Sequence, residues 1–368
     1  MRHEFKAAVL RAPGTPLTIE TVVGDLRGPH DVLVRIRATG LCHTDLEVLE
    51  GQLRYPMPII PGHEASGVVE AIGPSVTNVK PGDRVVLSWN PHCGACDACE
   101  EGQPILCQPY LREGPKGMLL DGTSRLELDG APVHHMFFLS SFAEYAIVTA
   151  GSVVKVQDEI PFDIASLIGC GVMTGVGAAT NIVRPRMGAT VVVIGCGAVG
   201  LAAIQGARIA GAGRILAVDL HQFKLDLALT LGATEAIPGD EDVLGVISEL
   251  TDGKGADIVI ECAGVASTLQ LSVEATRPGG SVVWLGKLGV DDPVTFRWGA
   301  LMGEKHITRS SYGGAKPLRD FPALVGMYLD GRLVLDPLVT GRIELSDIND
   351  GMRSLKEGNA IRTVITLS

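Results

Sequence analysis

The 368-residue sequence lacks the features that would point to nucleic-acid binding, membrane binding or a repeat protein. Its formal net charge is -11 and no basic block stands out, so binding to nucleic acid or to an anionic membrane is disfavoured. It has no internal repeat and no low-complexity tract. Residues 1–16 lack the apolar stretch of a secretory signal peptide, and we expect a cytoplasmic protein.

The composition predicts a folded chain with a sizeable core. Charged residues make up 20% and hydrophobic residues 46%, values that disfavour disorder. The length allows one large domain or two ordinary ones. The 8 cysteines are not spaced like the disulfide framework of a small secreted protein, so we expect metal ligands and buried thiols in a reducing compartment. Cys196 and Cys262 are expected to be buried thiols.

Four of the cysteines lie close together as Cys93-x2-Cys96-x2-Cys99-x7-Cys107, in a segment rich in turn formers. Two-residue gaps let neighbouring thiolates reach one metal ion, and four thiolates complete a tetrahedral zinc site with no open position. An iron–sulfur cluster is less favoured, because the ferredoxin pattern has a three-residue last gap followed by Pro. Four free buried cysteines at this spacing would be unusual. The spacing therefore predicts a structural zinc site.

The first third of the chain predicts a β-rich region. Apolar or alternating runs bounded by Gly, Pro, Asn and Asp are typical of short strands. A long polar insertion from about residue 111 to residue 132 interrupts this pattern. The expected strands span residues 7–11, 32–38, 67–72 and 84–87.

From residue 189 onward, strands and helices alternate with short connections, which predicts a parallel, doubly wound sheet. Residues 188–213 are almost all apolar or small, but their glycines and strand-then-helix pattern predict a buried α/β unit and not a membrane span. A last apolar strand is expected at 362–367. The other expected strands are 190–195, 214–219, 257–262 and 281–286, and the expected helices are 198–210, 222–231, 243–250 and 266–276.

A glycine-rich turn, Gly195-x-Gly197-x-x-Gly200, follows the first of these strands and opens a helix. The first glycine permits the tight turn, the second lets a pyrophosphate approach the backbone, and the third lets helix and strand pack closely. The N–H groups at the helix N-terminus then face the phosphates. Asp219 ends the next strand, where a carboxylate binds the ribose 2′-OH of NAD and repels the 2′-phosphate of NADP. The pattern predicts an NAD site, with a packing turn and a capping Asp as the alternative.

A second set of metal-type residues is dispersed along the chain. Cys42 follows an expected strand, His63 lies in a Gly-His-Glu run, and Cys170 shortly precedes the dinucleotide region. Two thiolates and one imidazole are the protein ligands of a catalytic zinc whose fourth position stays open. Taken singly, a Cys is usually a small buried hydrophobe and a His a satisfied polar residue. Spacing alone therefore leaves this second site undecided.

Several motifs occur together in an order that resembles the zinc-containing alcohol dehydrogenases of the medium-chain dehydrogenase/reductase superfamily, over nearly the whole chain. The motifs are Cys42-His43-Thr44-Asp45, Gly62-His63-Glu64-x2-Gly67-x5-Gly73-x2-Val76, the four-cysteine segment, Gly169-Cys170-Gly171, the Gly195 turn and Ile361-Arg362-Thr363. The resemblance implies an α/β fold with a GroES-like, β-rich catalytic domain and a Rossmann domain built on a doubly wound parallel sheet. The implied bounds are 1–172 for the catalytic domain with its structural zinc lobe, 173–314 for the NAD-binding domain, and 315–368 for a C-terminal return to the catalytic domain.

The resemblance implies roles for the residues around the catalytic zinc. Cys42, His63 and Cys170 would bind the metal. Glu64 would be the nearby carboxylate that can approach the metal, and Asp45 would orient His63.

The same resemblance implies a proton relay and a substrate pocket. Thr44 would hydrogen-bond the alcohol and pass its proton outward. Many relatives end this relay on a His, but that position holds Glu47 here, so His43 is the expected recipient. The residues implied to line the pocket, for which plain core packing is the alternative, are Trp89, Met136 and Phe137.

The resemblance also implies contacts with the coenzyme. His43 and Arg362 would face the pyrophosphate and Lys224 the adenosine ribose, with a merely solvated Lys224 as the alternative. The complete implied set is His43, Thr174, Gly195, Gly197, Val199, Gly200, Asp219, Lys224 and Arg362.

Together these features predict an NAD-dependent zinc alcohol dehydrogenase that acts on apolar or aromatic primary alcohols. We expect two Zn²⁺ per subunit, one catalytic and one structural, and a homodimer, with a homotetramer as the alternative. Two rival functions are a thiol-adduct (S-hydroxymethyl) formaldehyde dehydrogenase and a non-catalytic NAD-binding protein. The formaldehyde branch carries acidic residues where this chain has Gln52-Leu53-Arg54-Tyr55. A non-catalytic relative would not need the zinc ligands or Thr44.

Overall fold

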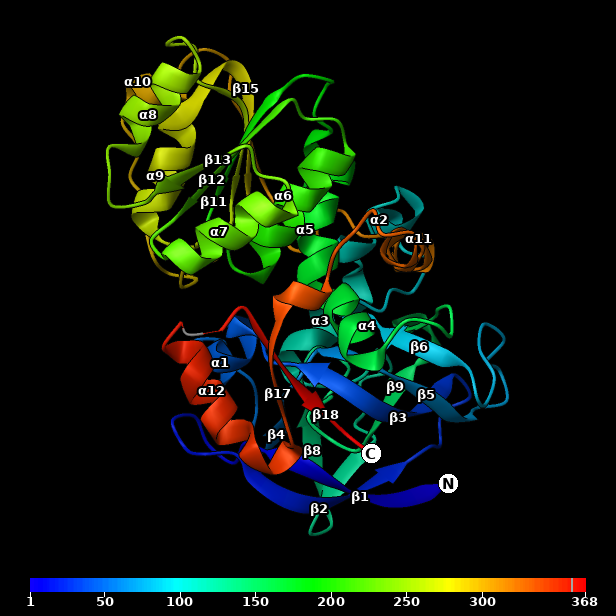
Figure 1. The fold of residues 1–368 in the computed structure, drawn as a ribbon. Coiled ribbons are helices and arrows are strands. Elements are labelled where there is room, and N and C mark those ends of the chain that lie inside the picture. The colour runs from blue at the N-terminus through cyan, green and yellow to red at the C-terminus, as the bar shows by residue number, and fades with distance from the viewer. Residues whose placement is uncertain (359) are drawn as a thin grey trace. The chain divides into compact units, whose positions relative to one another are not determined.

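The computed structural model describes residues 1–358 and 360–368, which fold as two compact units. Figure 1 shows their elements coloured along the chain. The first unit takes the beginning and the end of the chain, and the second takes the middle. The first unit comprises Met1–Cys170, Lys316–Gly331 and Leu335–Ser368, and the second comprises Gly171–Ala315 and Arg332–Val334.

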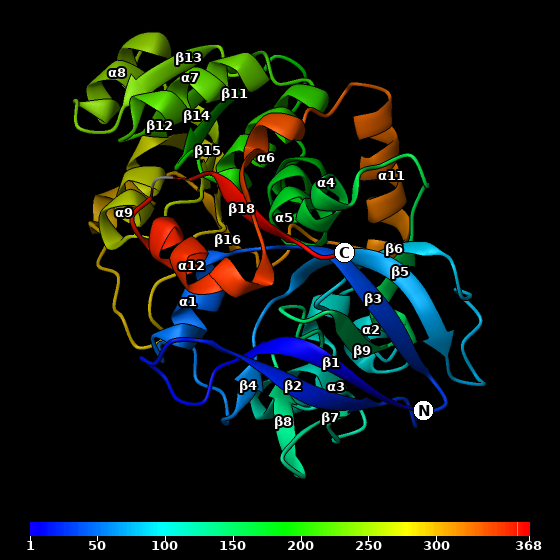
Figure 2. The same ribbon diagram turned by 60° about the horizontal axis from the view of Figure 1, so that its bottom comes forward.

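Two β-sheets form the framework of the first unit. In spatial order, one sheet contains β1 (Arg2–Val9), β2 (Thr18–Asp25), β7 (Leu126–Leu128), β8 (Ala131–His135) and β4 (Ile59–Ile60). The other contains β10 (Val153–Lys155), β6 (Arg84–Leu87), β5 (Glu64–Ile72), β3 (Asp31–Gly40), β18 (Arg362–Thr366) and β17 (Val339–Ile343), with β9 (Tyr145–Thr149) paired to β3. Because β18 pairs antiparallel with β3, residues near the C-terminus complete a sheet begun near the N-terminus (Figure 2).

The region from 111 to 132 is more ordered than the sequence indicated. It contains β7 and the start of β8, which pair antiparallel with each other. Leu126 and Leu128 are buried on either side of the half-buried Glu127. Three residues are too few for this alternation to be recognised among polar neighbours, which explains why the strand was missed.

Helices fill the connections of the first unit. In α12 the apolar residues Ile348, Met352 and Leu355 recur at three- and four-residue spacing and are buried, so one face of this helix packs into the core. That core also contains Leu41 and Ile365. The helices are α1 (His43–Leu49), α2 (Asp97–Glu100), α3 (Gln108–Glu113), α4 (Phe162–Leu167), α11 (Pro317–Leu329) and α12 (Ile348–Lys356).

A six-stranded sheet forms the centre of the second unit, and all its neighbouring strands run parallel. In spatial order the strands are β13 (Glu235–Pro238), β12 (Arg214–Asp219), β11 (Thr190–Ile194), β14 (Ala256–Glu261), β15 (Thr276–Trp284) and β16 (His306–Arg309). The prediction of a doubly wound parallel sheet is confirmed. The edge strands β13 and β16 were missed because each is a 4-residue, partly polar segment.

The helices of the second unit lie on both faces of this sheet. Figure 1 shows α6 and α7 together on one side and α8 and α9 together on the other. The winding reverses between β11 and β14, which is the position where ligands bind in folds of this kind. The helices are α5 (Met173–Gly177), α6 (Ala198–Ile209), α7 (Gln222–Leu231), α8 (Val243–Leu250), α9 (Ala266–Ala275) and α10 (Trp298–Leu301).

One continuous helical segment, Phe162–Val183, is long and apolar enough to cross a membrane by length and composition. In the structure, 83% of its most apolar window is buried inside the protein, as in the core helix of a globular fold. Within it, α4 and α5 are joined by a π-helical stretch, Ile168–Val172. The segment that the sequence flagged, 188–213, instead forms β11 and α6, as predicted.

A buried ion pair links the two sheets of the first unit. Asp31 at the start of β3 and Arg125 before β7 are only 2% and 4% exposed. Nε of Arg125 donates to Oδ2 of Asp31 at 2.6 Å, and Nη2 donates to Oδ1 at 3.1 Å. The backbone N–H of Gly28 donates to the same carboxylate at 2.7 Å. Each charge is therefore compensated by direct hydrogen bonds.

Removing one partner of this ion pair should destabilise the folded protein. In Arg125→Met the carboxylate of Asp31 stays buried without its cation, and we expect the free energy of unfolding to fall by about 3–5 kcal/mol. The double variant Arg125→Met/Asp31→Leu should recover much of this loss, since neither charge remains. Urea unfolding followed by circular dichroism measures both. A single variant as stable as the parent chain would contradict the account.

Candidate functional site

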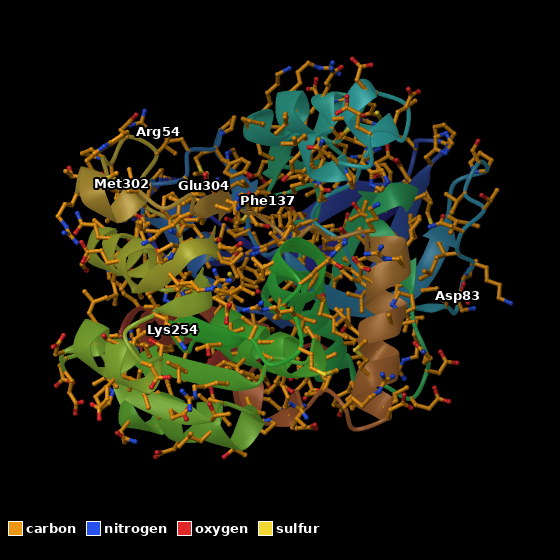
Figure 3. All side chains as sticks on the ribbon, turned by 90° about the horizontal axis from the view of Figure 1, so that it is seen from above. Arg54, Asp83, Phe137, Lys254, Met302 and Glu304 are labelled. Atoms are coloured by element: carbon orange, nitrogen blue, oxygen red, sulfur yellow. The ribbon has the colours of Figure 1, made fainter. Side chains whose placement is uncertain are left out.

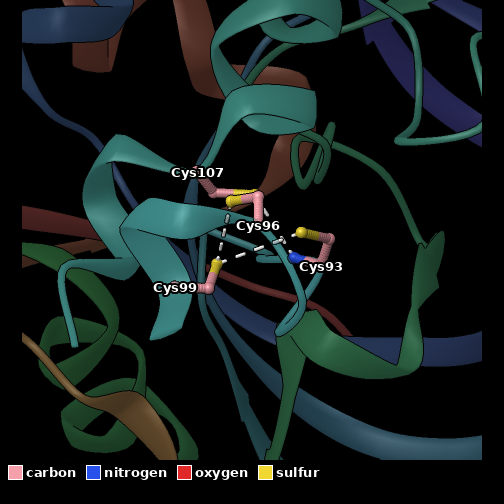
Figure 4. A group of neighbouring side chains, drawn as sticks. All are labelled: Cys93, Cys96, Cys99 and Cys107. Atoms are coloured by element: carbon pink, nitrogen blue, oxygen red, sulfur yellow. Dashed lines mark hydrogen bonds between the residues drawn. The ribbon is translucent and has the colours of Figure 1, made fainter. Parts of the chain in front are cut away.

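The four closely spaced cysteines converge on one point in the first unit (Figure 4). Their sulfur atoms all lie within 4.8 Å of one another. Sγ of Cys99 is 3.5 Å from Sγ of Cys96 and 4.0 Å from Sγ of Cys93. Four thiolates about 2.3 Å from one zinc ion stand about 3.8 Å apart, so this spacing fits a tetrahedral metal site.

The electrostatics of this group also fit a cation. The backbone N–H of Cys93 donates to Sγ of Cys107 at 3.3 Å, a contact that stabilises a thiolate. Backbone N–H groups of Gln108 and Cys99 lower the pKa of Cys96 to about 6, whereas burial raises the pKa of Cys99 to about 12. Four adjacent thiols cannot all ionise without a positive charge among them, and a divalent metal supplies it.

A second group, Cys42, His63, Glu64 and Cys170, brings together residues that are far apart in the sequence. One possible ligand atom from each lies within 4.8 Å of the others. Cys42 caps the N-terminus of α1 directly after β3, whereas Glu64 begins β5 and His63 precedes it. Since β3 and β5 are paired neighbours with Gly40 opposite Glu64, the strand register brings these segments to the same end of the sheet.

Asp45 fixes the orientation of this group. Its carboxylate is fully buried and accepts hydrogen bonds from the backbone N–H of Cys42 at 3.0 Å and of Gly62 at 3.1 Å. Nδ1 of His63 lies 3.1 Å from the same carboxylate. With Nδ1 engaged, Nε2 remains as the imidazole nitrogen available for a metal, an arrangement typical of histidine ligands.

Cys170 reaches the group from an irregular helix. It lies in the π-helical stretch Ile168–Val172 between α4 and α5. A π-helical turn widens the helix by one residue and so changes the direction of a side chain, and such turns often occur at functional sites. The Cys42 thiol raises the pKa of Cys170 well above its usual range, while Cys170 holds the pKa of Cys42 well below.

Glu64 and Arg362 lie beside this group as a buried pair. Nη1 of Arg362 is 3.4 Å from Oε1 of Glu64, and the same guanidinium donates to the backbone oxygen of Leu41. Among the described residues, neither carboxylate oxygen of Glu64 has a hydrogen-bond partner of normal geometry. Burial raises the pKa of Glu64 to about 8. The two thiols, the imidazole and this poorly satisfied carboxylate fit a divalent metal.

Aromatic residues border His63. The ring centroid of Phe137, which is labelled in Figure 3, lies 5.5 Å from that of His63 and 5.4 Å from that of Trp89. Met136 instead lies fully buried in the core cluster of the first unit. Sequence reasoning missed Tyr55, whose ring lies 6.2 Å from that of Phe137, and Tyr110, whose ring lies 6.4 Å from that of Trp89.

The glycine-rich turn lies at the carboxyl end of β11 in the second unit. Gly195 has φ +89°, and an added Cβ there would lie 2.8 Å from the backbone N of Ala263. A Cβ at Gly200 would lie 1.8 Å from the backbone O of Gly195, so helix and strand pack too closely for any side chain. A Cβ at Gly197, the N-cap of α6, would meet nothing within 4 Å. This open space before a helix N-terminus fits a pyrophosphate.

Asp219 lies at the end of β12, next to this turn. Its Oδ2 accepts a hydrogen bond from the backbone N–H of Cys196 at 2.7 Å, and its Oδ1 accepts one from that of His221 at 2.9 Å. Lys224 is half-buried on α7, and Val199 is half-buried on the first turn of α6.

The remaining residues expected to contact a coenzyme divide between the two units. Thr174 is buried in α5 of the second unit. His43 is an exposed residue on α1 of the first unit, and Thr44 beside it is half-buried. Arg362, also in the first unit, is the partner of Glu64 described above.

Two protein families match the chain. Residues 28–158 match the alcohol dehydrogenase GroES-like domain, and residues 198–329 match the zinc-binding dehydrogenase family. The matches confirm the expected combination of a GroES-like catalytic unit with a Rossmann unit.

Similarity also extends over whole proteins. Alcohol dehydrogenase class-P of Arabidopsis thaliana is 37% identical over 369 residues, which cover 98% of this chain and 97% of the relative. An S-(hydroxymethyl)glutathione dehydrogenase of Escherichia coli O139:H28 is 38% identical over 367 residues, covering 98% of this chain and 99% of the relative. Among solved structures, benzyl alcohol dehydrogenase from Acinetobacter calcoaceticus has a TM-score of 0.94 at 33% identity, and 100% of both chains is covered.

Asp45→Asn should weaken metal retention at the second cysteine group. The amide offers one acceptor oxygen in place of two, so one of the N–H groups of Cys42 and Gly62 or the imidazole of His63 loses its partner. Loss of such a supporting contact typically costs 10–100-fold in metal affinity. The rate at which a chelator removes zinc measures this retention, and circular dichroism checks that the variant is folded.

Asp350→Asn is the matched control, because Asp350 is an exposed residue of α12 whose side chain is 74% accessible. It should leave zinc retention unchanged. If Asp45→Asn retains zinc as well as the parent chain does, Asp45 does not orient the metal ligands.

Proposed function

We propose that this chain, which belongs to the zinc-containing alcohol dehydrogenases of the medium-chain dehydrogenase/reductase superfamily, oxidises apolar or aromatic primary alcohols with NAD. In the reverse direction it reduces the corresponding aldehydes. The observation that carries the substrate class is the aromatic wall beside His63, formed by Phe137 and Trp89. Such a wall favours apolar substrates, since each buried methylene contributes about 0.8 kcal/mol of transfer free energy.

The metal ligands would divide into two sites. Cys93, Cys96, Cys99 and Cys107 would hold a structural zinc with no open position. Cys42, His63 and Cys170 would hold the catalytic zinc and leave one position for substrate. Zinc in such a position supplies Lewis acidity to the alcohol oxygen. The carboxylate of Glu64 lies close enough to the three ligands to replace one of them at the metal. When Glu64 does not bind the metal, the guanidinium of Arg362 would balance the charge of this carboxylate.

Residues that follow Cys42 on α1 would handle the proton. The hydroxyl of Thr44 would accept a hydrogen bond from the alcohol and pass the proton outward. The imidazole of His43, one position earlier and exposed, would receive it, because histidine exchanges protons near neutral pH. A bound nicotinamide ring would supply the acceptor for the hydride, and that chemistry belongs to the coenzyme.

The second unit would bind the coenzyme at the switch point of its sheet. The pyrophosphate would lie on the backbone beside Gly197, at the N-terminus of α6. Asp219 would accept hydrogen bonds from the adenosine ribose, which selects NAD over NADP. Thr174, Val199 and Lys224 would add further contacts from the same unit.

The chief rival function is oxidation of the formaldehyde–thiol adduct. That branch carries acidic residues before its Gly-His-Glu, in the stretch where this chain has Gln52-Leu53-Arg54-Tyr55. Gln52 and Arg54 are exposed there, and Tyr55 turns its ring toward Phe137. These features support the aromatic or apolar alcohol. A non-catalytic role is disfavoured because the complete zinc ligand set and Thr44 are present.

A substrate survey tests this proposal. With NAD, kcat/KM should be higher for benzyl alcohol and medium-chain primary alcohols than for methanol or glycerol, since only the former bury apolar surface against the aromatic wall. NADH absorbance measures turnover. Activity that appears only when formaldehyde is mixed with glutathione would replace the proposal with its rival, and no activity with any of these substrates would favour the non-catalytic role.

Asp219→Gly should reduce the preference of the enzyme for NAD over NADP. Loss of the carboxylate removes hydrogen bonds to the ribose and the repulsion of a 2′-phosphate, so KM for NAD should rise about tenfold while KM for NADP falls. Asp219→Asn is the comparison variant, because it keeps an acceptor and removes only the charge. If the parent enzyme already uses NADP as efficiently as NAD, Asp219 does not select the coenzyme.

A further inference from the structure

A polar cavity of about 230 Å³ lies at the amino ends of the strands in the parallel sheet of the second unit. The first residues of β11 and β12 line it, together with residues near the start of β14 and β15 and the turn that follows α8. Thr190 at this end of β11 is about 16 Å along the strand from the glycine-rich turn at Gly195, so the cavity is separate from the expected coenzyme site. Pockets for drug-sized ligands usually measure about 300–1,000 Å³, so this cavity fits a smaller molecule.

Positive charge dominates the wall of this cavity. Among the described residues, four cationic and two anionic side chains line it, although the whole chain has a formal net charge of -11. The cations are Arg186, Arg214, Lys254 and Arg277. The anions are Asp252 and Asp257. An anionic occupant would therefore be attracted to this point of an otherwise acidic protein.

Asp257 holds two of these arginines in place without neutralising both. Its Oδ1 accepts hydrogen bonds from Nη2 of Arg186 at 3.1 Å and from Nε of Arg277 at 2.8 Å. Its Oδ2 accepts one from the backbone N–H of Thr190 at 2.9 Å, and its side chain is only 17% exposed. Since one carboxylate cannot balance two guanidinium groups, a positive charge and further N–H donors remain here.

The other two cations are weakly paired. Nε of Arg214 is 3.6 Å from Oε1 of Glu235, and the same guanidinium donates to the backbone oxygen of Leu250. Nζ of Lys254, which is labelled in Figure 3, is 4.0 Å from Oδ2 of Asp252, and these side chains are 75% and 89% exposed. An exposed ion pair of this kind contributes little, so Lys254 can bind another anion at little cost.

The turn between α8 and β14 brings Lys254 to the cavity with its own backbone donors already used. The N–H groups of residues 252–255 all donate within the turn or back to α8. A Cβ at Gly255 would lie 3.0 Å from the backbone N of Arg277, so the turn packs directly against the start of β15. An occupant of the cavity would therefore be held by side chains.

We propose that this cavity binds a phosphate group, either free inorganic phosphate or the phosphate of a small monoester. Guanidinium groups bind phosphate oxygens through two parallel hydrogen bonds, and a lysine adds a compact charge. A dianion would balance the two excess positive charges of the wall. It would also connect the loop before β11, the start of β12, the turn before β14 and β15. The inference goes beyond the proposed function and does not depend on it.

Titration of the whole protein with inorganic phosphate, followed by calorimetry, tests the proposal. We expect one saturable site per chain, and NAD should not displace the phosphate because the glycine-rich turn lies at the other end of the sheet. Sodium acetate at equal ionic strength should bind much more weakly, since it carries a single charge. Absence of saturable binding, displacement by NAD, or equal binding of acetate would each overturn the proposal.

Two variants test the location of the site. Arg186 and Lys254 have 75% exposed side chains, so replacing either should leave the fold intact. Arg186→Gln and Lys254→Gln each remove one charged donor, and the Kd for phosphate should rise about tenfold in each. Circular dichroism checks that both variants are folded.

Arg297→Gln is the matched control. Arg297 belongs to the same unit, its side chain is 74% exposed, and it pairs with Glu274 at 3.1 Å outside this cavity. It should keep the Kd of the parent protein. An unchanged Kd in Arg186→Gln, or an equal rise in Arg297→Gln, would overturn the proposed location.

A second titration distinguishes the two sources of the phosphate group. Glycerol 3-phosphate that binds more tightly than inorganic phosphate would identify a monoester as the ligand, and the reverse order would identify free phosphate. Either order supports the site if Arg186→Gln weakens the tighter ligand about tenfold. If Arg186→Gln leaves that affinity unchanged, the phosphate group lies elsewhere and the proposal is wrong.

Discussion

The catalytic half of this protein depends on one buried carboxylate, that of Asp45. A carboxylate removed from water is costly unless hydrogen bonds replace its hydration. Here they come from the backbone N–H groups of Cys42 and Gly62 and from the ring of His63. These donors belong to two segments that follow and precede neighbouring strands, so satisfying Asp45 fixes both segments relative to each other. The positions of the candidate metal ligands follow from that constraint, because His63 can offer only Nε2 toward Cys42 and Cys170.

Two segments of irregular backbone direct side chains toward the site where regular helices and strands would not. Cys170 lies in a π-helical stretch of an otherwise buried apolar helix, and Phe137 lies in a left-handed turn held by Met136 and Ser140. Both features depart from low-energy geometry at residues that border the same imidazole or join it in one ligand group. Departures from local preference are expected where function constrains the chain. The regular sheets provide rigidity, and these two irregular segments direct the side chains that contact the site.

The alternation of strands and helices after residue 189 was sufficient to predict the parallel sheet, and the glycine spacing predicted the turn at Gly195. Both signals are local, because periodicity and turn chemistry depend on residues near one another in the sequence. The short strands β7, β13 and β16 were missed because 3 or 4 residues carry too little periodicity. Tyr55 and Tyr110 carry no local signal, since their contacts with Phe137 and Trp89 exist only once the chain has folded.

The central claim is that one chain holds two different zinc sites, one closed by four thiolates and one open with two thiolates and an imidazole. X-ray absorption at the zinc edge tests this most directly, because it reports ligand type and distance without depending on turnover. Four thiolates in one site and two in the other predict an average of three sulfur ligands per zinc at about 2.3 Å, together with one nitrogen or oxygen at about 2.0–2.1 Å. A shell of sulfur alone would contradict the claim, since it would mean that zinc occupies only the four-cysteine site.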